Sequence, residues 1–249
     1  MEILGHRGWP APAHPENTLG AVRAAVAAGA HGVEVDIRMT ADGAAVCCHD
    51  PDLVRTSGVP HLVRRTSCAA LRKVRLAGGH RMPLLEEVVA LVAGRGLLVL
   101  DLKPEQRRPA LVRAVLDAMD GLPAADVVLS STERPLLRAF ATAWPHSQRA
   151  LITGAGVPAQ EAVDDAVAYG DAAVHPSVRE LLRDPRVMVQ AKSAGLAVRA
   201  WTVNRVLDAR MLELAEVDAV ITDVPATLLR DLRGAAAAAA GDSPLTTVG

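Results

Sequence analysis

The chain opens with two strand-like runs, Glu2-Ile3-Leu4-Gly5 and His31-Gly32-Val33-Glu34-Val35-Asp36-Ile37-Arg38, separated by a stretch of helical length at 18–29. Two parallel strands in one sheet need a long crossover connection, and a helix usually provides it. The beginning of the chain therefore predicts a strand–helix–strand unit with parallel strands. The rest of the chain repeats this alternation, so the unit decides the fold class.

Short β-branched or apolar runs alternate with Ala-Leu-rich or amphipathic runs along the chain. The predicted strands are 2–5, 32–38, 97–102, 126–130, 148–152, 171–174, 197–202 and 218–222. The predicted helices are 18–29, 84–94, 107–120, 134–143, 158–169, 177–194, 204–216 and 226–233. This alternation predicts an α/β fold, and eight strands in 249 residues match a TIM (β/α)8 barrel. A doubly wound open sheet is the alternative.

One segment interrupts the alternation after the second strand. Asp42-Gly43 predicts a tight hairpin turn that folds this strand back and delivers His49. Residues 51–82 are irregular, basic and rich in turn residues, and we expect a small insertion that acts as a lid over the barrel mouth. The predicted organisation is a single barrel domain at 1–233, followed by an Ala-rich, disordered tail at 234–249.

Composition excludes several classes of partner. The formal net charge is −1, which gives no global positive field for nucleic acid or for an anionic membrane surface. No run of about 18 apolar residues is present, so no integral membrane segment is predicted. The three cysteines, with no signal-peptide pattern before them, predict reduced thiols in a cytoplasmic protein. The oligomeric state is not specified by the sequence.

Chemically active side chains stand at the ends of several predicted strands. They are His6 and Arg7 after the first strand, Glu34 and Asp36 in the second, Asp101 and Lys103 at the end of the third, and Trp201 at the end of the seventh. Residues two apart in a strand point to the same face. Because TIM-barrel active sites lie at the carboxyl ends of the strands, we expect these side chains to meet at one mouth.

The three carboxylates predict a metal site. Glu34, Asp36 and Asp101 would repel one another, and raise one another's pKa values, unless a cation lay among them. An all-oxygen ligand set suits one divalent cation, Mg²⁺ or Ca²⁺, rather than zinc.

The basic side chains predict phosphate-ester chemistry beside that metal. Arg7 and Lys103 can neutralise a phosphodiester oxyanion, and His6 and His49 can transfer protons near neutral pH. Each group taken singly has a structural alternative, such as a helix cap for His6-Arg7, an ion pair within the strand for Asp101 and Lys103, an ordinary turn at His49, or a core position for Trp201. The remaining histidines are predicted as surface or packing residues: His14, His31, His61, His80, His146 and His175.

Several motifs follow one another in a fixed order. They are His6-Arg7-Gly8, Pro15-Glu16-Asn17-Thr18, Gly32-Val33-Glu34-Val35-Asp36, His49-Asp50-Pro51-x-Leu53-x-Arg55-Thr56, Asp101-x-Lys103, Ala200-Trp201-Thr202-Val203-Asn204 and Thr222-Asp223-x-Pro225. This order closely resembles the glycerophosphodiester phosphodiesterase family, and the resemblance extends from Gly5 to about Leu232. It implies a TIM barrel with a small insertion after the second strand.

The resemblance also implies roles for individual residues. Those roles are a metal held by Glu34, Asp36 and Asp101, phosphate contacts from Arg7 and Lys103, acid and base catalysis by His6 and His49, a lining or bracing position for Glu16, and packing of Trp201 on the glycerol or the leaving group. The implied reaction splits a small glycerophosphodiester into an alcohol and sn-glycerol 3-phosphate, by attack of the substrate's own 2-hydroxyl and through a cyclic phosphate.

Three departures from the family pattern are present: the first affects how the metal would be held, and the other two affect the expected substrate more than the expected reaction. Asp101 replaces the usual glutamate, Thr132 stands where an aromatic residue often follows Ser131, and Val224 replaces a common arginine. The alternatives are a lysophospholipase D or sphingomyelinase D-like enzyme acting on lipids, and a non-catalytic barrel that binds phosphate ligands. The head group and the choice between Mg²⁺ and Ca²⁺ are not specified.

Overall fold

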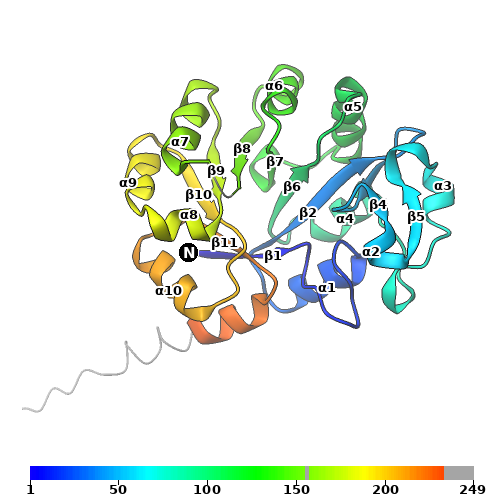
Figure 1. Ribbon diagram of the computed structural model, residues 1–249, viewed down its shortest axis with the longest axis horizontal. Helices are drawn as coiled ribbons and strands as arrows, with labels where there is room; N and C mark the ends of the chain where they lie inside the picture. The colour runs from blue at the N-terminus through cyan, green and yellow to red at the C-terminus, as the bar shows by residue number, and fades with distance from the viewer. Residues whose placement is uncertain (155–156, 233–249) are drawn as a thin grey trace, which may run out of the picture.

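A closed barrel of eight parallel strands forms the centre of the molecule (Figure 1). The computed structural model describes residues 1–154 and 157–232. The barrel strands are β1 (Glu2–His6), β2 (Gly32–Met39), β6 (Leu97–Leu102), β7 (Val127–Ser131), β8 (Gln148–Thr153), β9 (Ala173–Pro176), β10 (Ala197–Ala200) and β11 (Ala219–Thr222). Their order is β1-β11-β10-β9-β8-β7-β6-β2, and parallel pairing of β1 with β2 closes the ring. The predicted TIM barrel is confirmed, and the open sheet is excluded.

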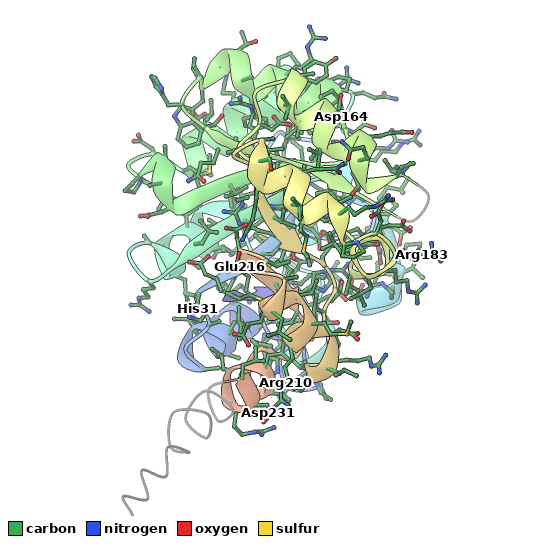
Figure 2. All side chains as sticks on the ribbon, turned by 90° about the vertical axis from the view of Figure 1, so that its left-hand side faces the viewer. His31, Asp164, Arg183, Arg210, Glu216 and Asp231 are labelled. Carbon is green, nitrogen blue, oxygen red and sulfur yellow. The ribbon has the colours of Figure 1, made fainter. Side chains whose placement is uncertain are left out.

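Helices between the strands surround the barrel. They are α1 (Leu19–Ala27), α4 (Leu85–Val92), α5 (Arg108–Ala118), α6 (Arg134–Ala143), α7 (Ala159–Ala168), α8 (Val178–Arg183), α9 (Arg186–Ser193) and α10 (Val206–Leu214), with a last helical stretch at 225–232. Figure 2 shows charged side chains such as Asp164, Arg183 and Arg210 projecting outward from α7, α8 and α10. None of the helices in the described part of the chain is long and apolar enough to cross a membrane.

One predicted helix is wrong. The stretch 177–194 is predicted as a single helix, but it forms α8 and α9, with Asp184 and Pro185 between them. Proline has no backbone N–H to donate, and its ring clashes with the preceding turn, so the first helix ends before Pro185. The second helix then begins directly after the proline, which sits at its N-cap.

Alternation along β2 explains how the carboxylates reach the barrel interior. Val33, Val35 and Ile37 are fully buried and belong to the large apolar cluster beneath the surrounding helices. The residues between them, Glu34 and Asp36, therefore point to the opposite face, which is the inside of the barrel. Lower in the barrel, apolar side chains of the other strands fill the interior.

The segment after β2 forms a separate small lobe beside the barrel (Figure 1). Gly43, with φ +91°, makes the turn to β3 (Ala45–Cys47), which pairs antiparallel with β2, so the predicted hairpin is confirmed. The lobe then contains β4 (Asp52–Leu53), α2 (Val54–Ser57), β5 (Val59–Leu62), η1 (Val63–Arg65), α3 (Cys68–Leu71) and η2 (Ala77–Gly79).

This lobe has a small apolar core of its own. Its buried residues are Val46, Cys48, Leu53, Val63, Leu71 and Met82. The insertion is therefore packed structure, and its action as a lid stays a prediction. The predicted tail at 234–249, and residue 233 before it, lie outside the described residues.

Candidate active site

A pocket of about 130 Å³ opens at the carboxyl ends of the barrel strands. Among the residues that line it are the predicted site residues His6, Arg7, Glu34, His49, Asp101, Lys103 and Trp201. Asp36 is not part of the lining; it is buried, with 1% of its surface exposed, and contacts the lining residues Arg7 and Lys103. Glu16 contacts Arg7 from outside the lining. The structure thus brings the predicted residues to one place, although they come from segments far apart in the sequence.

The turn after β1 places His6 and Arg7. Gly8 has φ +85°, and a Cβ there would lie 2.5 Å from the backbone carbon of Ala21 in α1. A Cβ on Gly5 would lie 2.3 Å from the Gly8 carbonyl oxygen. Both positions therefore require glycine. Arg7 itself has a left-handed backbone, with φ +56°, which is uncommon outside glycine and often marks functional sites.

The three carboxylates form one cluster. Glu34, Asp36 and Asp101 each offer an oxygen, and these oxygens lie within 4.8 Å of one another. Lys103 Nζ lies 2.6 Å from Asp36 Oδ1 and 2.6 Å from Asp101 Oδ2. Arg7 Nε lies 3.1 Å from Asp36 Oδ2. The shorter side chain of Asp101 therefore still reaches the cluster.

The two aspartates have opposite pKa shifts. Burial works to raise the pKa of Asp36, but the charges of Lys103 and Arg7 hold it below its usual value. Burial raises the pKa of Asp101 despite the nearby charge of Lys103. Burial also raises the pKa of Glu34 to about 7, and the negative charge of Asp36 adds to this effect.

The raised pKa values of Glu34 and Asp101 are the effect expected of buried, crowded carboxyl groups with no cation among them. The carboxylates number three, and the cations in direct contact with them are Lys103 and Arg7. A divalent cation held by oxygen ligands would supply the missing charge. The donor set therefore fits Mg²⁺ or Ca²⁺, at the place where the sequence predicts it.

Both histidines are oriented through the same ring nitrogen. His6 Nδ1 lies 2.7 Å from Asp223 Oδ1, and His49 Nδ1 lies 2.8 Å from Asp50 Oδ1. In each ring, Nε2 remains for a substrate in the pocket. His6 Nε2 lies 4.0 Å from Glu34 Oε2. Burial works to lower the pKa of His6, but the hydrogen bond to Asp223 and the charge of Glu34 raise it above its usual value.

A network of ion pairs braces Arg7 and His49 from the insertion. Arg7 Nη1 donates to Glu16 Oε1 at 2.8 Å. Arg55 donates to both oxygens of Glu16, at 2.7 Å each, and to Asp50 Oδ2 at 2.6 Å. Glu16 therefore braces the site, which is one of the two positions expected for it. Arg55 connects it to the carboxylate that orients His49.

Several residues of the site are not predicted from the sequence. His175 is predicted as a surface or packing residue, but it lines the pocket from β9 with 1% of its surface exposed. Burial, with a contribution from the charge of Arg199, holds the pKa of His175 well below its usual value. Its backbone oxygen accepts a hydrogen bond from Trp201 Nε1 at 2.8 Å, which fixes the indole at the pocket wall.

His175 follows a predicted strand, as His6 does, and this position is the signal that could have identified it. Asn17 was also missed. Its side chain donates to Asp36 Oδ2 at 2.6 Å and accepts from the Asp36 backbone N–H at 3.0 Å. Asp223, quoted only as part of a motif, receives a hydrogen bond from Asn204 Nδ2 at 2.7 Å in addition to its contact with His6.

Comparisons with known proteins identify the family of the chain. The chain matches the glycerophosphoryl diester phosphodiesterase family over residues 6–227. It is 28% identical to a glycerophosphodiester phosphodiesterase of Caldanaerobacter subterraneus subsp. tengcongensis, over 93% of this chain and 97% of that protein. It is 31% identical to probable glycerophosphodiester phosphodiesterase 1 of Mycobacterium tuberculosis, over 83% of each.

Solved structures share the fold. A glycerophosphodiester phosphodiesterase of Thermotoga maritima superposes with a TM-score of 0.78 at 26% identity, over 94% of this chain and 98% of that one. A phosphodiesterase of Oleispira antarctica, solved in complex with the product sn-glycerol-3-phosphate, gives a TM-score of 0.83 at 24% identity, over 94% and 97% of the two chains. The chain belongs to the glycerophosphoryl diester phosphodiesterase family, a family of phosphoric diester hydrolases.

Proposed function

We propose that this protein is a metal-dependent glycerophosphodiester phosphodiesterase that releases an alcohol and sn-glycerol 3-phosphate. The observation that carries the proposal is the meeting of three carboxylates, two cationic side chains and two oriented imidazoles around one pocket. The product bound to the Oleispira antarctica phosphodiesterase is consistent with it. A cytoplasmic location and the absence of a nucleic-acid partner stay predictions.

Glu34, Asp36 and Asp101 would hold the divalent cation. When bound, such an ion offsets negative charge on a phosphate oxygen and lowers the pKa of a hydroxyl near it. Lys103 and Arg7 line the pocket beside the carboxylates, so their positive charges face the phosphodiester. Trp201, held at the pocket wall by its hydrogen bond to the His175 carbonyl, packs against the glycerol.

The two histidines carry the protons in both steps. His49 takes the proton of the substrate's 2-hydroxyl as its oxygen bonds to phosphorus, and His6 protonates the alcohol oxygen as its bond to phosphorus breaks. The product of this step is a cyclic phosphate. His6 then takes a proton from the attacking water, and His49 protonates the 2-oxygen as the ring opens. The raised pKa of His6 supports its role as the first acid.

An attacking hydroxyl supplied by the substrate suits the pocket. Within the described part of the chain, the serine that lines it, Ser130, donates its hydroxyl proton to the Leu100 carbonyl oxygen at 3.1 Å. This serine is therefore turned away from the role of nucleophile. A hydroxyl already tethered to the phosphate needs no further orientation by the protein, which makes its attack efficient.

The test is release of sn-glycerol 3-phosphate from glycerophosphocholine by the purified protein, with EDTA, Mg²⁺ and Ca²⁺ compared. We expect release that depends on the metal and that falls at least about 100-fold in His6→Ala and in His49→Ala. His146→Ala, at an exposed position away from the pocket, is the matched control. Undiminished release by both variants would refute the mechanism. Hydrolysis of lysophosphatidylcholine alone would favour the lipid-specific alternative.

A further inference from the structure

A second pocket, of about 440 Å³, adjoins the barrel pocket at Lys103. Lys103 is part of the lining of both this pocket and the barrel pocket. The walls come from the end of β2, from the insertion, from the loop between β6 and α5, and from the start of α6. The charged residues around it are Arg38, Arg64, Lys103, Arg107 and Arg108, with Glu105 and Glu133. This excess of positive charge contrasts with the net charge of −1 of the whole chain.

Two of these arginines build the walls. Arg38 donates from Nε and Nη2 to the His49 backbone oxygen, at 2.9 and 2.6 Å. Arg107 donates to the backbone oxygens of Thr40 and Ala41, at 2.9 and 3.2 Å. Neutral carbonyl oxygens accept these hydrogen bonds, so the positive charge of Arg38 still contributes to the pocket. Arg107 is also paired with Glu105, at 3.5 Å, which offsets part of its charge.

The other two arginines have donors to spare. The Arg64 side chain makes no hydrogen bond or ion pair with any residue in the described ranges. Arg108 lies 3.9 Å from Glu133, which is a long ion pair, and its Nε is buried without an acceptor among the described atoms. A buried guanidinium nitrogen without an acceptor is costly, and an anion in the pocket would supply one.

We propose that this pocket binds the leaving alcohol of the substrate and selects alcohols that carry a phosphomonoester of their own. The inference rests on the proposed function and names its substrate class. A phosphodiester held at Lys103 has its glycerol in the barrel pocket, beside Trp201, and its other ester oxygen directed to the second pocket. The planar forks of Arg64 and Arg108 match the oxygens of a phosphate group.

The lining argues against a quaternary ammonium head group. Such groups are bound by aromatic side chains, and within the described residues no aromatic side chain lines this pocket. The surplus of arginine would also repel the positive charge of choline. The same positive charges would bind a leaving group with two negative charges more tightly.

The experiment compares three substrates with the purified enzyme at saturating divalent cation. They are glycerophosphoglycerol, its analogue with a phosphate on the terminal hydroxyl of the leaving glycerol, and glycerophosphocholine. We expect kcat/KM for the phosphorylated substrate to exceed that for glycerophosphoglycerol about 100-fold, in keeping with two added charge-assisted contacts of about tenfold each. Because the contacts are partly exposed, the preference should shrink between 20 mM and 500 mM NaCl.

Substitutions in the second pocket test whether its arginines cause the preference for the phosphorylated substrate. Arg64→Gln and Arg108→Gln should each lower kcat/KM for the phosphorylated substrate about tenfold, and change that for glycerophosphoglycerol less than twofold. Arg113→Gln, at an exposed position further along α5, is the matched control and should change neither value. Equal rates on the charged and neutral substrates, or equal losses on both in the two variants, would overturn this inference and leave the proposed function intact. No hydrolysis of any of the three substrates would overturn both.

Discussion

Asp223 is predicted to act on catalysis through His6, and Asp223→Asn tests this role. The Asp223 carboxylate keeps His6 Nδ1 at 2.7 Å and stabilises the protonated ring. Asparagine preserves the size of the side chain and removes its charge. A hydrogen bond to a charged group contributes about 1.5–3 kcal/mol, and the 38% exposure of Asp223 places this bond at the lower limit. A loss of about 1.5 kcal/mol corresponds to roughly tenfold in rate.

The pH profile distinguishes a role in orienting the acid from a general structural effect. His6 must be protonated to act as the first acid, so activity falls as the pH rises through its pKa. Without the Asp223 charge this pKa falls, and the alkaline limb of kcat/KM moves to lower pH. We therefore expect the roughly tenfold loss near pH 8 and a smaller loss near pH 6. The assay is initial-rate release of sn-glycerol 3-phosphate across this range.

The control for this experiment is Asp231→Asn, at the partly exposed carboxylate labelled in Figure 2, which pairs with Arg230. This variant should keep the wild-type profile. The reasoning would be refuted by an unchanged alkaline limb in Asp223→Asn, or by the same loss at every pH together with a lowered melting temperature.

Three further outcomes follow from the structure. Arg55→Gln removes the two ion pairs that join the insertion to the site. Since the side chain is 49% exposed and each pair contributes about 0.2–1 kcal/mol, kcat/KM should fall about 2- to 30-fold, and Arg65→Gln should leave it unchanged. His175 is buried and neutral in the folded state, so below pH 6.5 only the unfolded state gains a proton at this residue, and the free energy of unfolding falls as the pH is lowered. In urea unfolding, His175→Gln should make the decrease in the free energy of unfolding between pH 8 and pH 5 smaller by about 2 kcal/mol. Mg²⁺ or Ca²⁺ at 100 times its Kd should raise the melting temperature of the wild type by about 5–10 °C, and Glu34→Gln should abolish this rise.

The barrel could be predicted from the sequence because its information is local. Each strand and helix has its own pattern of apolar residues. Within the described residues, the predicted bounds agree with the structure to within two residues, except at 177–194. There the charged and apolar residues at helical spacing favour one helix, and the break depends on Pro185 alone. The carboxylates were predicted for a related reason, since Glu34 and Asp36 share one face of a strand whatever the rest of the chain does.

The contacts that orient the catalytic groups could not be predicted in this way. His6 and Asp223 are 217 positions apart, and only closure of the barrel brings the end of β11 beside the end of β1. Arg55 and Glu16 are 39 positions apart and meet because the insertion folds back toward α1. The burial of His175 likewise depends on the neighbouring strands of the closed ring. Pairwise contacts of this kind have no periodic signal in the sequence.

The two histidines depend on different parts of the chain, and this division has a consequence for catalysis. His49 is oriented by Asp50, which Arg55 holds from within the insertion, so its position depends on the packing of that lobe. His6 is oriented by Asp223, so its position depends on the last strand completing the barrel. The acid and the base are therefore both correctly oriented only when the insertion and the closed barrel are both formed. Glu16 connects the insertion to the barrel, because it contacts both Arg7 and Arg55.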